Sequence, residues 1–173
     1  MMGALALQMA SALGTDAVGA LFLGTGIAKM LDQPGFASVI ASYRLVPLGA
    51  AFPVARLLTG AQILLGVWLC SGVLTREACL CAVILLVAFA LAMGINVARG
   101  RTGLSCGCLP GRDTPLSSRS VMQTLLLALL MLGAGSIGHP PGALLGAITL
   151  LGGVSLLLLA LAASQLGTAG DAA

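Results

Sequence analysis

Hydrophobic residues run along this chain in long blocks, which are separated by short intervals rich in glycine, proline and charge. A helix needs about 20 apolar residues to cross a bilayer. Blocks of about this length lie at 14–31, 50–70, 78–98, 119–138 and 143–161. The pattern predicts an all-α integral membrane bundle of four to five transmembrane helices, formed by a single membrane domain over residues 1–173.

The interval between the first two blocks has a different pattern. Phe36, Val39, Ile40 and Tyr43 recur at helical spacing among small and polar residues. This spacing predicts a short interfacial helix, with Tyr43 and Arg44 at the level of the lipid headgroups.

Small side chains recur every four positions in two of the blocks. The two rows are Ala20, Gly24 and Ala28 in the first block, and Ala51, Ala55 and Thr59 in the second. Rows of this kind let helices approach closely in lipid, so both are expected at helix contacts.

A few polar residues interrupt the apolar blocks. We expect Gln62 to form a hydrogen bond inside the bundle, because an unpartnered amide in hydrocarbon is costly. Lys29, at the end of the first block, is expected to extend its ammonium group towards the membrane surface. Asp16 leaves two interpretations open: an intramembrane functional carboxylate, or a Thr15-Asp16 cap at the true start of the helix.

The candidate chemistry lies in the polar, glycine-rich interval 99–117, which contains Cys106-Gly107-Cys108. Glycine gives the backbone freedom for two such close thiols to face each other, and a disulfide over so short a loop is strained and oxidising. Arg99 and Arg101 favour the reactive thiolate. The interval predicts a redox-active dithiol, with Cys106 the preferred attacking thiol and Cys108 the resolving one. Idle surface thiols and half of a metal site remain alternatives.

Three further cysteines fall at the opposite ends of the spans. Cys70 ends the second block, and Cys79 and Cys81 begin the third. A continuous helix from Cys81 to Cys106 would rise about 37 Å, so direct exchange between the two groups would need a large motion or a shuttle. They are either small apolar core residues or a disulfide of Cys70 with Cys79 or Cys81.

Composition narrows the class of protein. The chain is 59% hydrophobic and only 8% charged, whereas soluble domains carry about a quarter charged residues. The basic residues are too few, and too poor in aromatic neighbours, for a nucleic-acid partner. We expect no cofactor and no metal, and membrane lipid as the surroundings.

Seven of the eight basic residues fall on the side of the Cys106-Gly107-Cys108 loop. They are Lys29, Arg44, Arg56, Arg99, Arg101, Arg112 and Arg119, and only Arg76 falls on the other side. The positive-inside rule therefore predicts that the loop faces the cytoplasm.

Four stretches in this order resemble the MauE family, membrane proteins of methylamine-utilisation operons that are related to DoxX-type redox-associated bundles. The similarity runs from about Gly19 to Leu130. The stretches are Gly26-Ile27-Ala28-Lys29, Tyr43-Arg44-Leu45-Val46-Pro47, Ile95-Asn96-Val97-Ala98-Arg99-Gly100-Arg101 and Cys106-Gly107-Cys108.

The resemblance implies a multi-pass protein of the bacterial inner membrane that works with a MauD-like, thioredoxin-like redox protein. Its client would be the small subunit of methylamine dehydrogenase, which needs disulfide formation during maturation. Cys106 and Cys108 would be the exchanging pair, and Lys29 and Tyr43 supporting positions. This role implies a periplasmic dithiol, in conflict with the charge rule.

The chain departs from the family pattern at several positions. Gln62 stands where the family often has a glutamate, and Leu109-Pro110-Gly111 replaces the usual phenylalanine and glycine after the cysteine pair. Two other functions stay open: a non-catalytic scaffold that docks partner and client, and a quinone-coupled disulfide oxidase.

Overall fold

The computed structural model describes residues 2–101, 103–104, 117–137, 151–152 and 155. The described residues form helices and no strand. In chain order these are α1 (Met2–Leu31), α2 (Gln33–Tyr43), the 3-10 turn η1 (Leu48–Ala50), α3 (Ala51–Ser71), α4 (Thr75–Ala98) and α5 (Ser118–Ile137). Of these, α1, α3, α4 and α5 are long and apolar enough to cross a membrane. The predicted all-α membrane bundle is therefore confirmed.

Two helices begin earlier than their hydrophobic blocks. α1 begins at Met2, so Thr15 and Asp16 lie inside a continuous helix and the capping interpretation is wrong. α4 begins at Thr75, because the polar turn after α3 is shorter than expected. Within the fifth predicted span, 143–161, only residues 151–152 and 155 are described, so that span and the single domain over the whole chain stay predictions.

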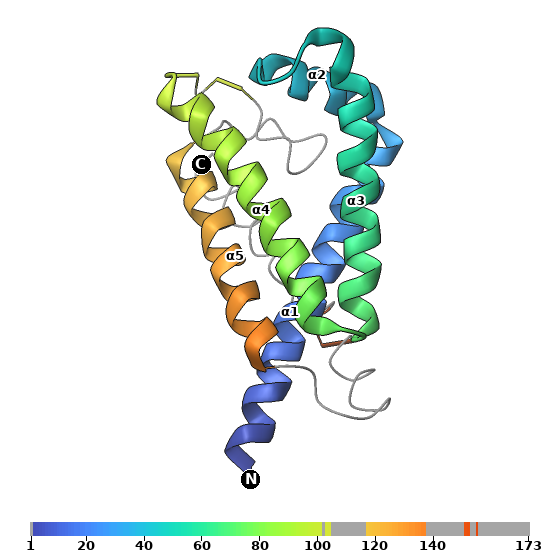
Figure 1. Cartoon of the computed structure of the whole chain (residues 1–173), viewed down its shortest axis with the longest axis vertical. Coiled ribbons are helices and arrows are strands. Elements are labelled where there is room, and N and C mark those ends of the chain that lie inside the picture. The colour runs from blue at the N-terminus through green and yellow to red at the C-terminus, as the bar shows by residue number, and fades with distance from the viewer. Residues whose placement is uncertain (1, 102, 105–116, 138–150, 153–154, 156–173) are drawn as a thin grey trace, which may run out of the picture.

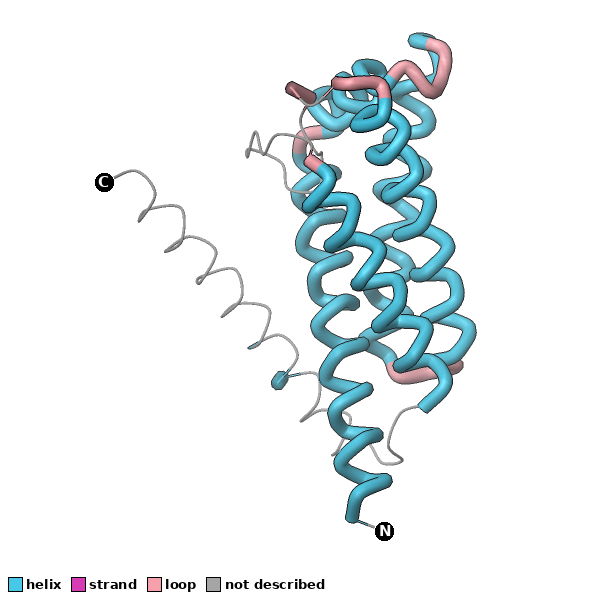
Figure 2. Tube along the Cα trace, turned by 90° about the vertical axis from the view of Figure 1, so that its left-hand side faces the viewer, coloured by secondary structure: helices cyan, strands magenta, loops and turns pink. Residues whose placement is uncertain are grey.

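The four long helices stand side by side and alternate in direction, while α2 lies across one end of them (Figures 1 and 2). α1 packs mainly against α3 and α4 against α5, and α1 also contacts α5. We call the end that carries α2, Ala98 and Ser118 the α2 end. The opposite end, at the turn formed by residues 72–74, is the turn end.

α2 is the predicted short helix. Asp32 accepts a hydrogen bond from the backbone N–H of Gly35 and caps the start, and Arg44 ends the helix in the left-handed conformation (φ 51°). Its apolar face packs on the bundle through the buried rings of Phe36 and Tyr43. Tyr43 is only 8% exposed and packs with Met93 of α4, while Arg44 is exposed. The headgroup level expected for both residues stays a prediction.

α1 and α3 approach most closely where glycine faces glycine. A Cβ atom added at Gly66 would lie 2.9 Å from the backbone oxygen of Gly19 and 2.9 Å from the backbone nitrogen of Leu23. Gly26, two turns beyond Gly19, faces Ile63 in the same way. Among the described residues nothing lies within 4 Å of a Cβ atom added at Gly24, so α3 does not meet the expected row at this glycine, and a contact of the row with another helix stays a prediction.

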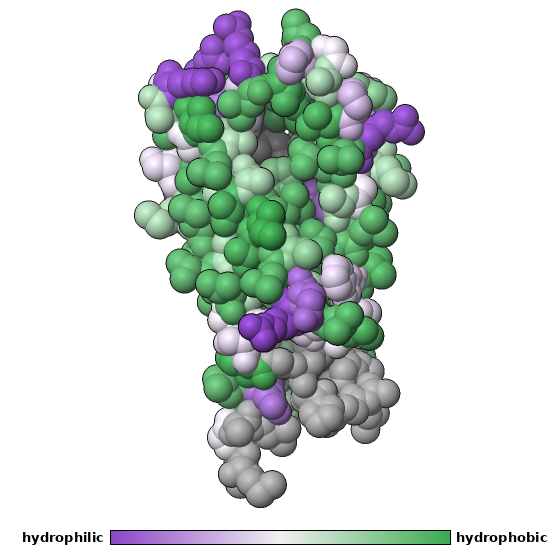
Figure 3. Space-filling view, viewed as in Figure 1, coloured by the Kyte–Doolittle hydropathy of each residue, from purple (hydrophilic) through white to green (hydrophobic). Residues whose placement is uncertain are grey.

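The second row of small residues is confirmed, because Ala51, Ala55 and Thr59 are all buried. Outside these contacts the long helices present leucine and isoleucine, and the space-filling view shows an apolar belt between polar ends (Figure 3). This distribution is the one that surrounding lipid requires.

Candidate functional site

A chain of buried hydrogen bonds crosses from α1 to α3 near the α2 end. The Lys29 ammonium donates to Gln62 Oε1 at 2.9 Å, and Gln62 Nε2 donates to Thr25 Oγ1 at 2.7 Å. The Thr25 hydroxyl donates in turn to the backbone oxygen of Leu21 at 2.7 Å. We call this the Lys29–Gln62–Thr25 chain. It confirms the hydrogen bond expected of Gln62 inside the bundle.

Lys29 does not extend to the membrane surface, and that prediction is wrong. Its side chain is 4% exposed. The ammonium lies 4.8 Å from the centre of the Phe36 ring and 5.2 Å from that of Phe89. Two ring faces and an amide oxygen offset part of the lost hydration, and each cation–π contact at a desolvated site is worth about 2 kcal/mol. Lys29 thus joins α1 to α2, α3 and α4 at one point.

Two more buried polar residues lie within two helical turns of residues that contact Lys29. Thr59 is one turn from Gln62 on α3, and Asn96 is two turns from Phe89 on α4; both are towards the α2 end. Within the described part of the chain, Thr59 Oγ1 and Asn96 Oδ1 have no hydrogen-bond partner. Asn96 Nδ2 donates to the backbone oxygen of Ala92 at 2.9 Å.

The end of α4 connects this buried group to the dithiol interval. The backbone oxygen of Asn96 accepts a hydrogen bond from the Arg101 N–H at 3.0 Å, just after α4 ends. Arg99 is exposed and Arg101 is half-buried. Cys106 and Cys108 lie outside the described residues. The residues that flank them, Arg101 and Ser117, belong to the α2 end.

The sequence singled out only part of this group. The resemblance implies supporting roles for Lys29 and Tyr43, the sequence predicts a buried hydrogen bond for Gln62, and the structure brings all three to the α2 end. The sequence pattern places Phe36 on an interfacial helix face, Thr59 in a row of small residues and Asn96 in a family-like stretch. Phe89 gave no signal, because one phenylalanine in an apolar span does not reveal which helix its ring faces.

The other three cysteines are free thiols at the turn end. Cys70 Sγ lies 3.9 Å from the Asp16 backbone oxygen and against Gly19 of α1. Cys79 instead lies against Gly135 of α5. Because these two side chains contact different helices, the structure contains no disulfide between them. Asp16, nearly fully buried inside α1, keeps its intramembrane interpretation.

Charge is distributed between the two ends as the sequence suggested. Arg44, Arg56, Arg99 and Arg119 are exposed near the α2 end, and Arg76 is exposed at the turn end. Lys29 no longer counts towards the positive-inside comparison, because its charge is buried. Among the described residues, no group of three or more His, Cys, Asp and Glu residues could hold a metal ion.

Gln62→Leu is expected to destabilise the bundle by about 2 kcal/mol, because it removes the amide that accepts from a buried ammonium. Unfolding in detergent, followed by the fluorescence of the single tryptophan, Trp68, measures the loss. Lys29→Met should cost less in the Gln62→Leu background than in the native chain. Additive effects of the two substitutions would contradict a direct energetic link between them.

The fold and the buried polar chain define a multi-pass helical membrane protein. The family model described as "Methylamine utilisation protein MauE" matches residues 7–139. The chain belongs to the MauE family. No solved structure matches it significantly.

Relatives named "Methylamine utilization protein MauE" agree with this assignment. That of Paracoccus denitrificans is 36% identical over 152 residues, which cover 85% of this chain and 81% of the relative. That of Paracoccus versutus is 34% identical over 152 residues, covering 86% and 82%. That of Methylophilus methylotrophus is 33% identical over 116 residues, covering 67% and 60%.

Proposed function

We propose that this protein is a membrane thiol–disulfide exchange protein of methylamine utilisation that acts through Cys106 and Cys108. The names of its relatives support a role in methylamine utilisation. One observation carries the proposal: three of the four family-like stretches, with Lys29, Tyr43 and Asn96, gather at the α2 end, where Arg101 and Ser117 flank the cysteine pair.

The exchange proceeds in two steps that conserve sulfur bonds and electrons. The Cys106 thiolate attacks a partner disulfide, forms a mixed disulfide and releases one partner thiolate. The Cys108 thiolate then attacks Cys106 Sγ, which closes the Cys106–Cys108 disulfide and releases the second partner thiolate. Two electrons pass to the partner, and the reverse sequence oxidises it.

The partner in this proposal is a MauD-like, thioredoxin-like protein, and the client is the small subunit of methylamine dehydrogenase. The chain lies in the bacterial inner membrane. Arg99 and Arg101, directly before the cysteine segment, raise the local positive potential and so increase the thiolate fraction.

The buried polar chain has a positioning role in this proposal. Lys29 contacts groups on α2, α3 and α4, and α4 is the helix that leads into the cysteine segment. Holding these helices together restricts the motion of the end of α4, from which the segment with Cys106 and Cys108 continues.

Cys108→Ser is expected to trap the partner, because the mixed disulfide at Cys106 then has no resolving thiol. Membranes from cells that express this variant should give a covalent complex on non-reducing gels, which disappears on reduction. The matched control, Cys106→Ser with Cys108→Ser, should give none. If the single variant also gave no complex with the thioredoxin-like protein present, a non-catalytic scaffold would replace the exchange proposal.

A further inference from the structure

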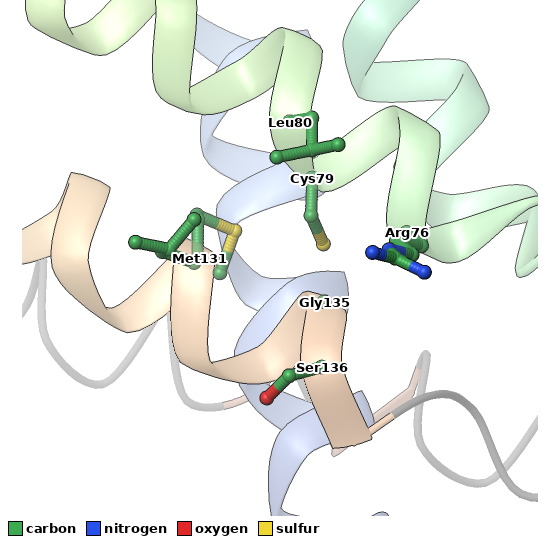
Figure 4. Close-up of a pocket in the computed structure, with 7 residues that line it drawn as sticks. Arg76, Cys79, Leu80, Met131, Gly135 and Ser136 are labelled. Atoms are coloured by element: carbon green, nitrogen blue, oxygen red, sulfur yellow. The ribbon is translucent and has the colours of Figure 1, made fainter.

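A cavity of about 440 Å³ lies between α4 and α5 at the turn end, far along the bundle from the α2 end (Figure 4). Its walls come from the first two turns of α4 and the last two turns of α5. Its volume is within the range of roughly 300–1,000 Å³ that small-molecule sites occupy. Nothing in the proposed thiol exchange uses this space.

The lining divides into a cationic part and an apolar part. Arg76 supplies an exposed guanidinium group, while Leu80, Met131 and Leu132 supply apolar surface. Leu132 is 52% exposed, so the apolar part opens onto the outer surface of the bundle. The Ser136 hydroxyl also borders the cavity, but it already donates to the Gly133 backbone oxygen at 2.6 Å. Arg76 is therefore the main donor that the lining offers to a ligand.

Glycine keeps the floor of the cavity narrow and closed. A Cβ atom added at Gly135 would lie 3.0 Å from Cys79 Cβ, so α5 and α4 are close together there. Figure 4 shows the Cys79 sulfur directed towards Gly135, with Met131 to one side of Cys79 and Arg76 to the other. The cavity is thus a cleft with one basic edge rather than a gap through the bundle.

The position of the cavity relates it to the membrane boundary. Thr75 begins one candidate spanning helix and Ile137 ends another, so we expect this cleft to lie where hydrocarbon gives way to headgroups. The first turn of α4 has no side-chain cap, so its backbone N–H groups add to the positive potential beside Arg76. Glu77 follows Arg76 and is exposed, but it does not line the cavity.

We propose that this cleft binds one anionic phospholipid, with its phosphate on the Arg76 guanidinium and its acyl chain along Leu80 and Leu132. Guanidinium groups pair with phosphate through two parallel hydrogen bonds. Lipid surrounds the spanning helices at high concentration, so a cleft with a basic edge at headgroup level and apolar walls below it matches a phospholipid better than a soluble anion. The proposal is independent of the thiol chemistry.

A bound lipid would stabilise the α4–α5 pair. The ligand contacts both helices of the pair, and any ligand that binds only the folded state raises its stability. These are also the helices that flank the cysteine segment at the α2 end.

Native mass spectrometry of the purified full-length protein in detergent tests the proposal, with phosphatidylglycerol, phosphatidylcholine or inorganic phosphate added. We expect phosphatidylglycerol to be retained in preference to phosphatidylcholine. Arg76→Gln should lower phosphatidylglycerol binding by about fivefold, as expected for one basic residue, and leave phosphatidylcholine unchanged. Arg44→Gln, which removes an exposed arginine from the α2 end, is the matched control and should change neither.

A second variant separates the cleft from surface charge. Leu132→Trp keeps Arg76 but narrows the cavity, and it should also lose phosphatidylglycerol; because Leu132 is largely exposed, the bundle should fold. Unchanged phosphatidylglycerol binding in Arg76→Gln would overturn the proposal. Loss of phosphatidylglycerol binding in Arg76→Gln without a loss in Leu132→Trp would also overturn it, because that result would indicate binding by surface charge alone. Competition by millimolar inorganic phosphate would assign the site to a soluble anion instead.

Discussion

Maturation of the methylamine dehydrogenase small subunit is expected to stop completely when Cys106 and Cys108 are both replaced by serine. Serine cannot form the sulfur–sulfur bond on which both exchange steps depend, so no partial route through this pair remains. Serine is close to cysteine in size, so the variant should reach the membrane in normal amounts. Assembly of active client enzyme in cells, compared at equal levels of the variant, measures the effect.

Cys81→Ala provides the matched control for this experiment. Cys81 is a free thiol at the turn end and is only half-buried, so its loss should leave maturation and folding nearly unchanged. A double-serine chain that still supported full client assembly would reject the exchange mechanism, and the scaffold function would then explain the requirement for the protein.

The second large effect is expected at the crossing of α1 and α3. Gly66→Ala should destabilise the bundle by about 1–3 kcal/mol, because its methyl group would meet two backbone atoms of α1 that cannot turn aside. The two helices would have to separate, and the Lys29–Gln62–Thr25 chain, which joins the same helices, would lengthen. Denaturant unfolding in detergent, followed by Trp68 fluorescence, measures the change.

Gly60→Ala is the control in the same helix. Among the described residues a Cβ atom at Gly60 meets nothing within 4 Å, so the substitution should be neutral or slightly stabilising through helix propensity. Equal destabilisation by the two substitutions would mean that the Gly19–Gly66 contact does not limit the approach of the helices.

Much of the architecture could be predicted from hydropathy alone. The blocks located α3 and α5 to within a few residues, and the spacing of Phe36, Val39, Ile40 and Tyr43 located α2. Hydropathy succeeds here because lipid makes an unpaired backbone so costly that long apolar segments must be helical. It failed for the start of α1, because residues 2–13 continue a helix that is not needed to span the membrane.

The candidate site depended on information that a linear pattern does not contain. A lysine near a helix end normally extends to water, but here the neighbouring rings and the Gln62 oxygen help to make the interior acceptable to Lys29. Gly24 fits a four-residue repeat, yet the glycines of α1 that meet α3 are Gly19 and Gly26.

The sequence by itself determined that this is a helical membrane protein with a paired-cysteine interval, since length, hydropathy and residue spacing suffice for both. Only the tertiary structure decided that a buried cation holds four helices together near the end of the bundle where that interval begins. It also revealed the cleft beside Arg76. Which face of a helix meets which neighbour depends on close packing across the whole bundle, and no local spacing encodes that choice.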